Sequence, residues 1–176
     1  WSLITFLGAA EVLVAERFGG TLRRLLVTPT GKATILTGKV LARLAMGLVQ
    51  MLLLIGFGGV VLGVHWANSP LALGLMVLAF ASAAVALGIL LATFSRTRSQ
   101  AAWLGVAFVM IMSALGGAWW PMEVTPPLYQ SVVRVLPTTW AMRGFTDVVV
   151  RGQGVAGIYV EVLVLLGFAL AFFTAG

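Results

Sequence analysis

The hydrophobic positions of this chain gather into five long runs, which polar stretches separate. A helix needs about 20 residues to cross the ~30 Å hydrocarbon core of a bilayer. The pattern therefore predicts an all-α polytopic membrane protein, in which a bundle of five transmembrane helices forms a single transmembrane domain. The expected spans are residues 1–15, 44–64, 71–94, 101–120 and 155–176.

The first run is shorter than a complete span, and the chain begins at Trp1 without an initiator methionine. The last run is still apolar at Gly176. We therefore expect the sequence to be a piece of a longer membrane domain, with more apolar sequence before residue 1.

Composition supports a membrane protein and excludes several kinds of site. Hydrophobic residues make up 61% of the chain, charged residues only 9%, and the mean hydropathy is +1.09. A soluble domain carries about 25% charged residues, so this chain could not cover a water-facing surface. Cysteine is absent, which excludes disulfides and thiolate metal sites. The net charge of +6 is small and follows the membrane topology, so we expect no nucleic-acid partner.

The basic residues predict which side of the membrane each loop faces. Eight of them fall on one side and three on the other, and loops rich in Lys and Arg stay in the cytoplasm. Five of the six tryptophans fall at the opposite boundary, as expected for amphipathic rings at an interface. Both signals predict that Trp1 lies on the outer side and Gly176 on the cytoplasmic side of the membrane. We expect this membrane to be the cytoplasmic membrane of a bacterium or archaeon. The eight residues are Arg17, Arg23, Arg24, Lys32, Lys39, Arg43, Arg96 and Arg98.

The polar stretch 16–39 contains a short amphipathic pattern. Thr21 can cap a helix, and Pro29 should end it, because the residue before a proline is pushed out of the α region. Arg23 and Arg24 flank one small apolar face. The pattern predicts a short helix on the cytoplasmic side, presented to another molecule. The residues of that face are Leu22, Leu25 and Leu26.

The stretch 121–154 predicts two short helices at the outer interface. Pro121 closes the fourth run. Thr125 is expected to cap the first helix, whose first turn holds Pro126 and Pro127, and Pro137 should end it.

The second outer helix should start near Thr138 or Thr139, and Gly152 and Gly154 should stop it. On it Arg143, Asp147 and Arg151 recur at i, i+4 and i+8. This spacing predicts one polar stripe with opposite charges adjacent, and apolar residues over most of the remaining surface.

Two strongly polar residues, Gln50 and Glu161, lie inside apolar runs. An intramembrane carboxylate is a candidate functional group, because its burial in lipid is costly. The alternative for Glu161 is structural: a bond to a neighbouring helix, or to the face that carries Arg143 and Arg151. The structural role is the simpler prediction.

A possible phosphate loop at Gly31 and Lys32 fails on inspection. Such a loop needs a glycine five residues before the Gly-Lys pair, where this chain has Leu26, and a hydroxyl where it has Ala33. The sequence also lacks a nucleophile beside a base, and paired catalytic carboxylates. We expect no enzymatic activity and no bound cofactor in this chain.

Two sets of residues together resemble the membrane subunits of type 2 ABC exporters, and they occur in order along the whole chain. The first set resembles the family's cytoplasmic signature loop: Glu16, Arg17, Gly20, Thr21, Leu22, Leu25, Thr28, Pro29, Gly38, Lys39 and Gln50. The second resembles its outer re-entrant region: Gly116, Gly117, Pro121, Pro126, Pro127, Leu136, Pro137, Thr138, Trp140, Arg143 and Gly144.

The resemblance implies a permease subunit with six spans in its full length, paired with a second permease subunit in membrane lipid. ATP and Mg²⁺ would be bound by a separate ATPase subunit. The helix around 21–28 would be the coupling helix, with the leucine face as its anchor. The family's coupling contacts would fall on Glu16, Arg17, Gly20, Thr21, Leu22, Arg23, Arg24, Leu25, Leu26 and Pro29. An extracellular gate would fall on Pro121, Pro126, Pro137, Trp140 and Arg143.

An amphipathic, drug-like, lipid-like or glycan cargo suits a pathway whose spans carry so few charges. An ion-coupled secondary transporter is an alternative, but it would need more acidic residues at mid-membrane and repeated halves. A non-transporting scaffold is a third possibility, and it would leave the coupling-type loop without a purpose.

Overall fold

The computed structural model describes residues 32–61, 63, 69–120 and 122–176. Every regular element in these residues is a helix, which confirms the all-α prediction. The expected span 1–15 and the coupling helix lie outside the described residues. The elements are α3 (Lys32–Val61), α4 (Pro70–Phe94), α5 (Arg98–Leu115), η1 (Met122–Val124), α6 (Pro127–Val133), α7 (Pro137–Val149), η2 (Val155–Gly157) and α8 (Tyr159–Ala175).

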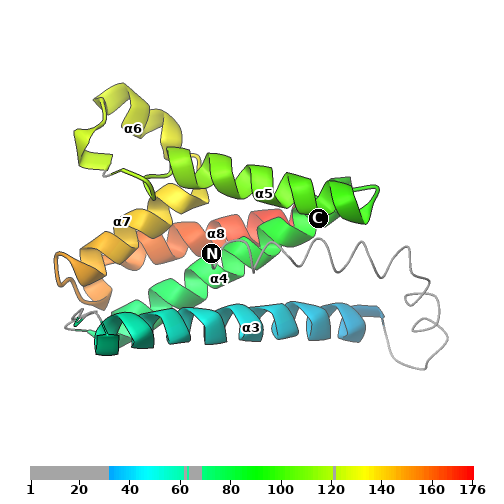
Figure 1. Ribbon diagram of the computed structural model, residues 1–176, viewed down its shortest axis with the longest axis horizontal. Coiled ribbons are helices and arrows are strands. Elements are labelled where there is room, and N and C mark those ends of the chain that lie inside the picture. The colour runs from blue at the N-terminus through cyan, green and yellow to red at the C-terminus, as the bar shows by residue number, and fades with distance from the viewer. Residues whose placement is uncertain (1–31, 62, 64–68, 121) are drawn as a thin grey trace.

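Helix α4 is the centre of the bundle and contacts α3, α5, α7 and α8 (Figure 1). It begins at Pro70, and the Ser69 side chain accepts a hydrogen bond from the backbone N–H of Ala72. Its buried surface is rich in alanine, and small side chains let neighbouring helices approach closely. Phe80 also meets Phe145 of α7 edge to face, with ring centroids 6.0 Å apart.

Helix α3 exposes apolar side chains along most of its length. Leu53 is 69% exposed and Phe57 58% exposed, which fits a surface that faces lipid. The helix begins at Lys32, well before the expected start at residue 44, so the prediction of a loop up to residue 39 was wrong. Lysine and arginine are good helix formers, and their long stems let the charge reach the interface from inside a helix.

Two helices are long and apolar enough to cross a membrane within the part of the chain that the structure describes. They are Thr37–Val61 and Pro70–Phe94, while Ser99–Leu115 and Tyr159–Ala175 are shorter. Helix α5 ends at Leu115, before the expected residue 120, because Gly117 turns the chain with φ +89°. Helix α8 begins after the short turn η2. The count of five spans stays a prediction.

The two short helices predicted for residues 121–154 are present, but two of their predicted boundary signals were wrong. The N-cap position of α6 is Pro126, and the Thr125 hydroxyl instead donates to the carbonyl of Met122 (2.7 Å). Pro137 begins α7 and does not end α6, since a proline at the first position of a helix loses no hydrogen bond. Leu136, just before it, is extended, as residues before proline prefer.

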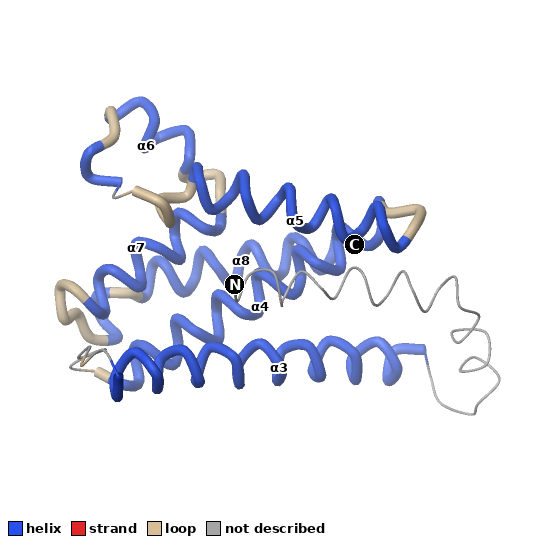
Figure 2. Tube along the Cα trace, in the orientation of Figure 1, coloured by secondary structure: helices blue, strands red, loops and turns tan. Residues whose placement is uncertain are grey.

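Helix α7 packs against α4 and α8 and buries one side, while α6 stands away from the other helices at one end of the bundle (Figure 2). The turn between α4 and α5 lies at the opposite end of α5 (Figure 1). Given the charge distribution, we expect the α6 end to face outward.

Cysteine labelling tests this orientation, because the chain has no cysteine of its own. Ser99 of α5 and Ser131 of α6 are both exposed, so each can be replaced by cysteine with little strain. In intact cells an impermeant maleimide should label Ser131→Cys and leave Ser99→Cys unlabelled until the cells are permeabilised. Labelling of Ser99→Cys but not of Ser131→Cys in intact cells would contradict the predicted orientation.

Candidate functional site

An open cavity of about 790 Å³ lies at the α6 end of the bundle. Its walls come from residues 117–120 with Met122, from Gln130 of α6, from the C-terminal part of α7 and from Glu161 of α8. These segments are far apart in sequence, and the packing of α7 on α8 brings them together. The cavity contains both charged side chains and indole rings.

An ion pair joins two of the predicted stripe residues at the cavity wall. Arg151 Nη1 lies 2.5 Å from Asp147 Oδ1, and Asp147 is only 7% exposed. Gly152, with φ +65°, reverses the chain just after α7. The N–H of the next residue, Gln153, then donates a hydrogen bond to the backbone carbonyl of Asp147 (2.8 Å). These contacts fix the C-terminal end of α7, and the predicted charge pairing is present for this pair.

Arg143 and Trp140 also meet, on the N-terminal half of α7. The Arg143 Cζ atom lies 5.8 Å from the centroid of the Trp140 ring, within the range of a cation–π contact. The indole Nε1 of Trp140 donates to the carbonyl of Arg134 at the end of α6 (2.7 Å). Two residues of the expected gate are therefore in contact, and they connect α7 to α6.

The other expected gate residues are prolines with structural positions. Pro126 is at the N-cap position of α6, Pro137 begins α7, and Pro121 lies outside the described residues. The ATPase-coupling residues 16–29 also lie outside them. Gln50 is half-buried on α3 and does not line the cavity.

Glu161 lies in the first turn of α8, and its Oε2 atom is buried without a hydrogen-bond partner. This oxygen makes neither the expected bond to a neighbouring helix nor one to the face that carries Arg143 and Arg151, and the structural role of Glu161 stays a prediction. A Cβ at Gly144 of α7 would lie 3.2 Å from the Glu161 Cβ, so the two helices touch at this level. The approach holds the carboxylate at the cavity wall.

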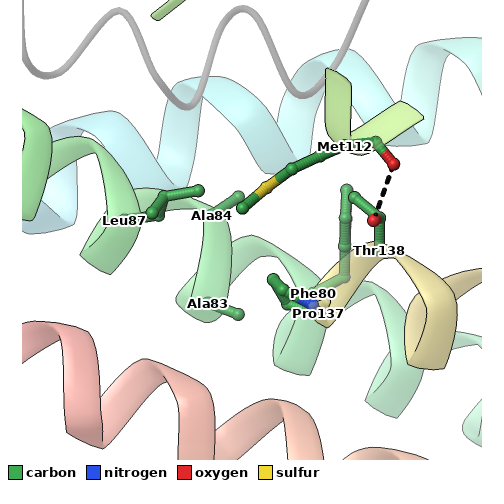
Figure 3. Close-up of a pocket in the computed structure, with 7 residues that line it drawn as sticks. All are labelled: Phe80, Ala83, Ala84, Leu87, Met112, Pro137 and Thr138. Atoms are coloured by element: carbon green, nitrogen blue, oxygen red, sulfur yellow. Dashed lines mark hydrogen bonds between the residues drawn. The ribbon is translucent and has the colours of Figure 1, made fainter. Parts of the chain in front are cut away.

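Two adjacent threonines anchor the start of α7, and the sequence analysis gave them no such role. Thr138 donates its hydroxyl to the carbonyl of Met112 in α5 (2.9 Å), as Figure 3 shows. Thr139 donates to the carbonyl of Val133 in α6 (2.7 Å). Each carbonyl also accepts a backbone hydrogen bond, that of Met112 from Gly116 and that of Val133 from Leu136. A carbonyl oxygen has two lone pairs, so it can accept the threonine hydroxyl as well.

The contact between α4, α5 and α7 is tightly filled. A void of only about 10 Å³ remains there, between apolar side chains of the three helices (Figure 3). Thr138 is 3% exposed at this contact. The contact between α4, α5 and α7 is thus well packed, and the open cavity of about 790 Å³ is separate from it.

Comparison with known proteins identifies the family. A family model described as ABC-2 family transporter protein matches residues 1–176, the whole chain. The chain belongs to the ABC-2 transporter family. The expected membership of the ABC transporter permease family is thereby confirmed, while the roles of the cytoplasmic loop and of the region 116–144 stay predictions.

Several relatives of the chain are permeases of bacteria. The chain is 32% identical over 174 residues to the linearmycin resistance permease protein LnrN of Bacillus subtilis, covering 99% of the chain and 45% of that protein. It is 29% identical over 180 residues to the inner membrane transport permease YhhJ of Escherichia coli, covering 98% and 46%. It is 24% identical over 174 residues to the probable multidrug ABC transporter permease YbhS of Escherichia coli, covering 97% and 46%. The chain spans a little under half the length of these relatives.

Reversal of one charge tests the outer helices. Arg143→Glu removes the contact with Trp140 and sets like charges at i, i+4 against Asp147, which costs the helix only about 0.2–0.5 kcal/mol. If the region gates release, export should fall several-fold while the amount of protein in the membrane stays near normal. Export per molecule is measured against the level on a quantitative blot.

The matched control is Arg134→Glu, the same reversal at an exposed residue after α6. It should leave export near the wild-type rate. If Arg143→Glu also exports normally, the α7 contact with Trp140 has no part in transport.

Proposed function

We propose that this chain is the membrane domain of an ABC exporter permease, which moves an amphipathic substrate outward using ATP hydrolysed by a separate partner subunit. The match of the ABC-2 family model to the whole chain carries the proposal. The names of the relatives, linearmycin resistance permease and probable multidrug permease, support export of drug-like molecules across a bacterial inner membrane.

The partners follow from the same assignment. An ATPase subunit docks on the cytoplasmic helix around 21–28, and a second permease subunit, a copy or a homologue, completes the pathway. Leu22, Leu25 and Leu26 are the buried anchors of that contact, and Arg17, Arg23 and Arg24 are its rim. The outer helices α6 and α7 control release.

An amphipathic substrate fits the chemistry of the described helices. Helix α4 has no charged residue, and α3 has none after Arg43. The outer cavity, in contrast, combines indole rings with charged groups. A substrate with an apolar body and a polar end would find both environments along its route, whereas a small ion would find little to replace its water.

Nucleotide binding tests the division of labour between subunits. The stretch at Gly31 and Lys32 lacks the glycine and the hydroxyl that a phosphate loop needs, so the purified permease alone should neither bind nor hydrolyse ATP. Isothermal titration with MgATP should give no saturable heat. After reconstitution with its partner ATPase, the complex should hydrolyse ATP and export substrate.

Two results would contradict the proposal. One is saturable ATP binding by the permease without a partner. The other is substrate movement in proteoliposomes that follows an imposed proton or sodium gradient and not ATP, which would favour a secondary transporter.

A further inference from the structure

The outer cavity contains a carboxylate whose hydrogen bonding is incomplete. The Oε2 atom of Glu161 is buried at the cavity wall and has no partner among the described residues. Removing water from a carboxylate oxygen without replacing its hydrogen bonds is unfavourable. Glu161 itself lines the cavity, so a small rotation of its carboxylate would let a hydrogen-bond donor in the cavity recover that loss.

Neighbouring charges in the cavity already have contacts. Asp147 binds Arg151, and the guanidinium of Arg143 lies over Trp140. Glu161 is in the first turn of α8, where the free backbone N–H groups favour a negative charge. Glu161 is therefore the cavity residue with a carboxylate oxygen that lacks a hydrogen-bond partner, and a ligand can supply the missing donor.

The remaining walls suit an apolar body of drug-like size. The volume of about 790 Å³ lies within the ~300–1,000 Å³ of typical small-molecule sites. Trp119 and Trp120 lie edge to face with ring centroids 6.0 Å apart, and both are half-exposed. Indole faces attract ammonium groups as well as apolar surfaces.

We propose that this cavity binds an amphipathic molecule that carries a protonated amine. Glu161 accepts hydrogen bonds from the ammonium group, and Trp119 and Trp120 contact the apolar body. Binding would give the exporter a preference for amphiphilic amines, a role that rests on the proposed function, although binding itself needs no ATP.

Two matched fluorescent ligands distinguish the contribution of the ammonium group to binding from that of the apolar body. Monodansylcadaverine has a dansyl ring and a primary ammonium, and its N-acetyl derivative keeps the ring and loses the charge. Binding is measured to the full-length permease in phosphatidylcholine nanodiscs, as energy transfer from tryptophan to dansyl. The amine should bind at least about tenfold more tightly than the acetylated ligand, because a charged donor then meets a charged acceptor.

Variants then assign the preference to one side chain. Glu161→Gln, which is nearly isosteric, should weaken binding of the amine about tenfold or more and leave the acetylated ligand unchanged. Glu161→Asp keeps the charge and should retain part of the preference. Arg134→Gln, an exposed charge outside the cavity, should change neither affinity.

Three results would overturn the inference. The first is equal binding of both ligands by the wild-type protein, a comparison that depends on no variant. The second is unchanged amine affinity in Glu161→Gln. The third is an equal loss for both ligands in that variant, because the carboxylate would then only shape the cavity.

The experiment is independent of the coupling to ATP. Selective amine binding without ATP-dependent export would support this inference and contradict the proposed function. Export driven by ATP, with no preference for the amine in the binding assay, would do the opposite.

Discussion

Replacing Gly116 by alanine should detach the start of α7 from the end of α5. A Cβ at this position would lie 2.6 Å from the carbonyl oxygen of Met112 and 2.7 Å from the Cβ of Thr138. Neither neighbour can move away easily, since one is backbone and the other is a buried β-branched side chain that bonds to that backbone. We expect a loss of about 1–3 kcal/mol in the stability of this contact, as for other overpacked sites.

Thermal unfolding of the purified permease in detergent, followed by tryptophan fluorescence, measures this loss. Gly74→Ala on α4 is the matched control, because nothing lies within 4 Å of the Cβ that it adds. Alanine in place of glycine inside a helix is favourable by about 0.5–1 kcal/mol, so the control should unfold at the same temperature or higher. If Gly116→Ala unfolds at the same temperature as the control, the contact between α5 and α7 in Figure 3 tolerates the added methyl group and is not tightly packed.

The long apolar helices were predictable because local rules define them. The expected span 71–94 differs from α4 by one residue at its start, where Pro70 and the Ser69 cap begin the helix. Apolar content, however, does not define where a helix ends. Residues 32–43 continue α3 although they include Lys39 and Arg43, since charged residues with long stems are also good helix formers.

The outer region shows which features local signals miss. A proline can follow one helix or begin the next, and the position of Pro137 depends on how Thr138 and Thr139 bond to α5 and α6. Those two bonds join residues that are 26 and 6 positions apart. Sequence reasoning could propose helices here, but the contacts that orient them come from tertiary packing.

The same contrast between local signals and tertiary packing applies to the pairings of the candidate site residues. Asp147 and Arg151 are one helical turn apart, and the predicted pair is present. Glu161 belongs to α8, whereas Arg143 lies on α7 and Arg151 just after it, and the Oε2 atom of Glu161 has no hydrogen-bond partner. The cavity itself depends on the packing of α7 against α8, which periodicity cannot supply.

The cytoplasmic contact should be the most sensitive point of the transporter. If Leu22, Leu25 and Leu26 insert into a groove of the ATPase, they form the anchor of a small interface, in which a few buried side chains carry most of the binding energy. Leu25→Ala removes three buried carbons, a loss on the order of 2 kcal/mol at ~0.8 kcal/mol per methylene-sized group. Docking should then weaken some tens of times, since each ~1.4 kcal/mol is tenfold.

The expected phenotype separates coupling from folding. Leu25 is outside every predicted span, so Leu25→Ala should reach the membrane in normal amounts, while it loses its ATPase on affinity purification and exports nothing measurable. Arg23→Ala, at the rim of the same helix, should retain the partner and most of the export, because exposed charges contribute little to such contacts. Normal retention and export by Leu25→Ala would show that the leucine face is not where ATP hydrolysis is transmitted to the membrane.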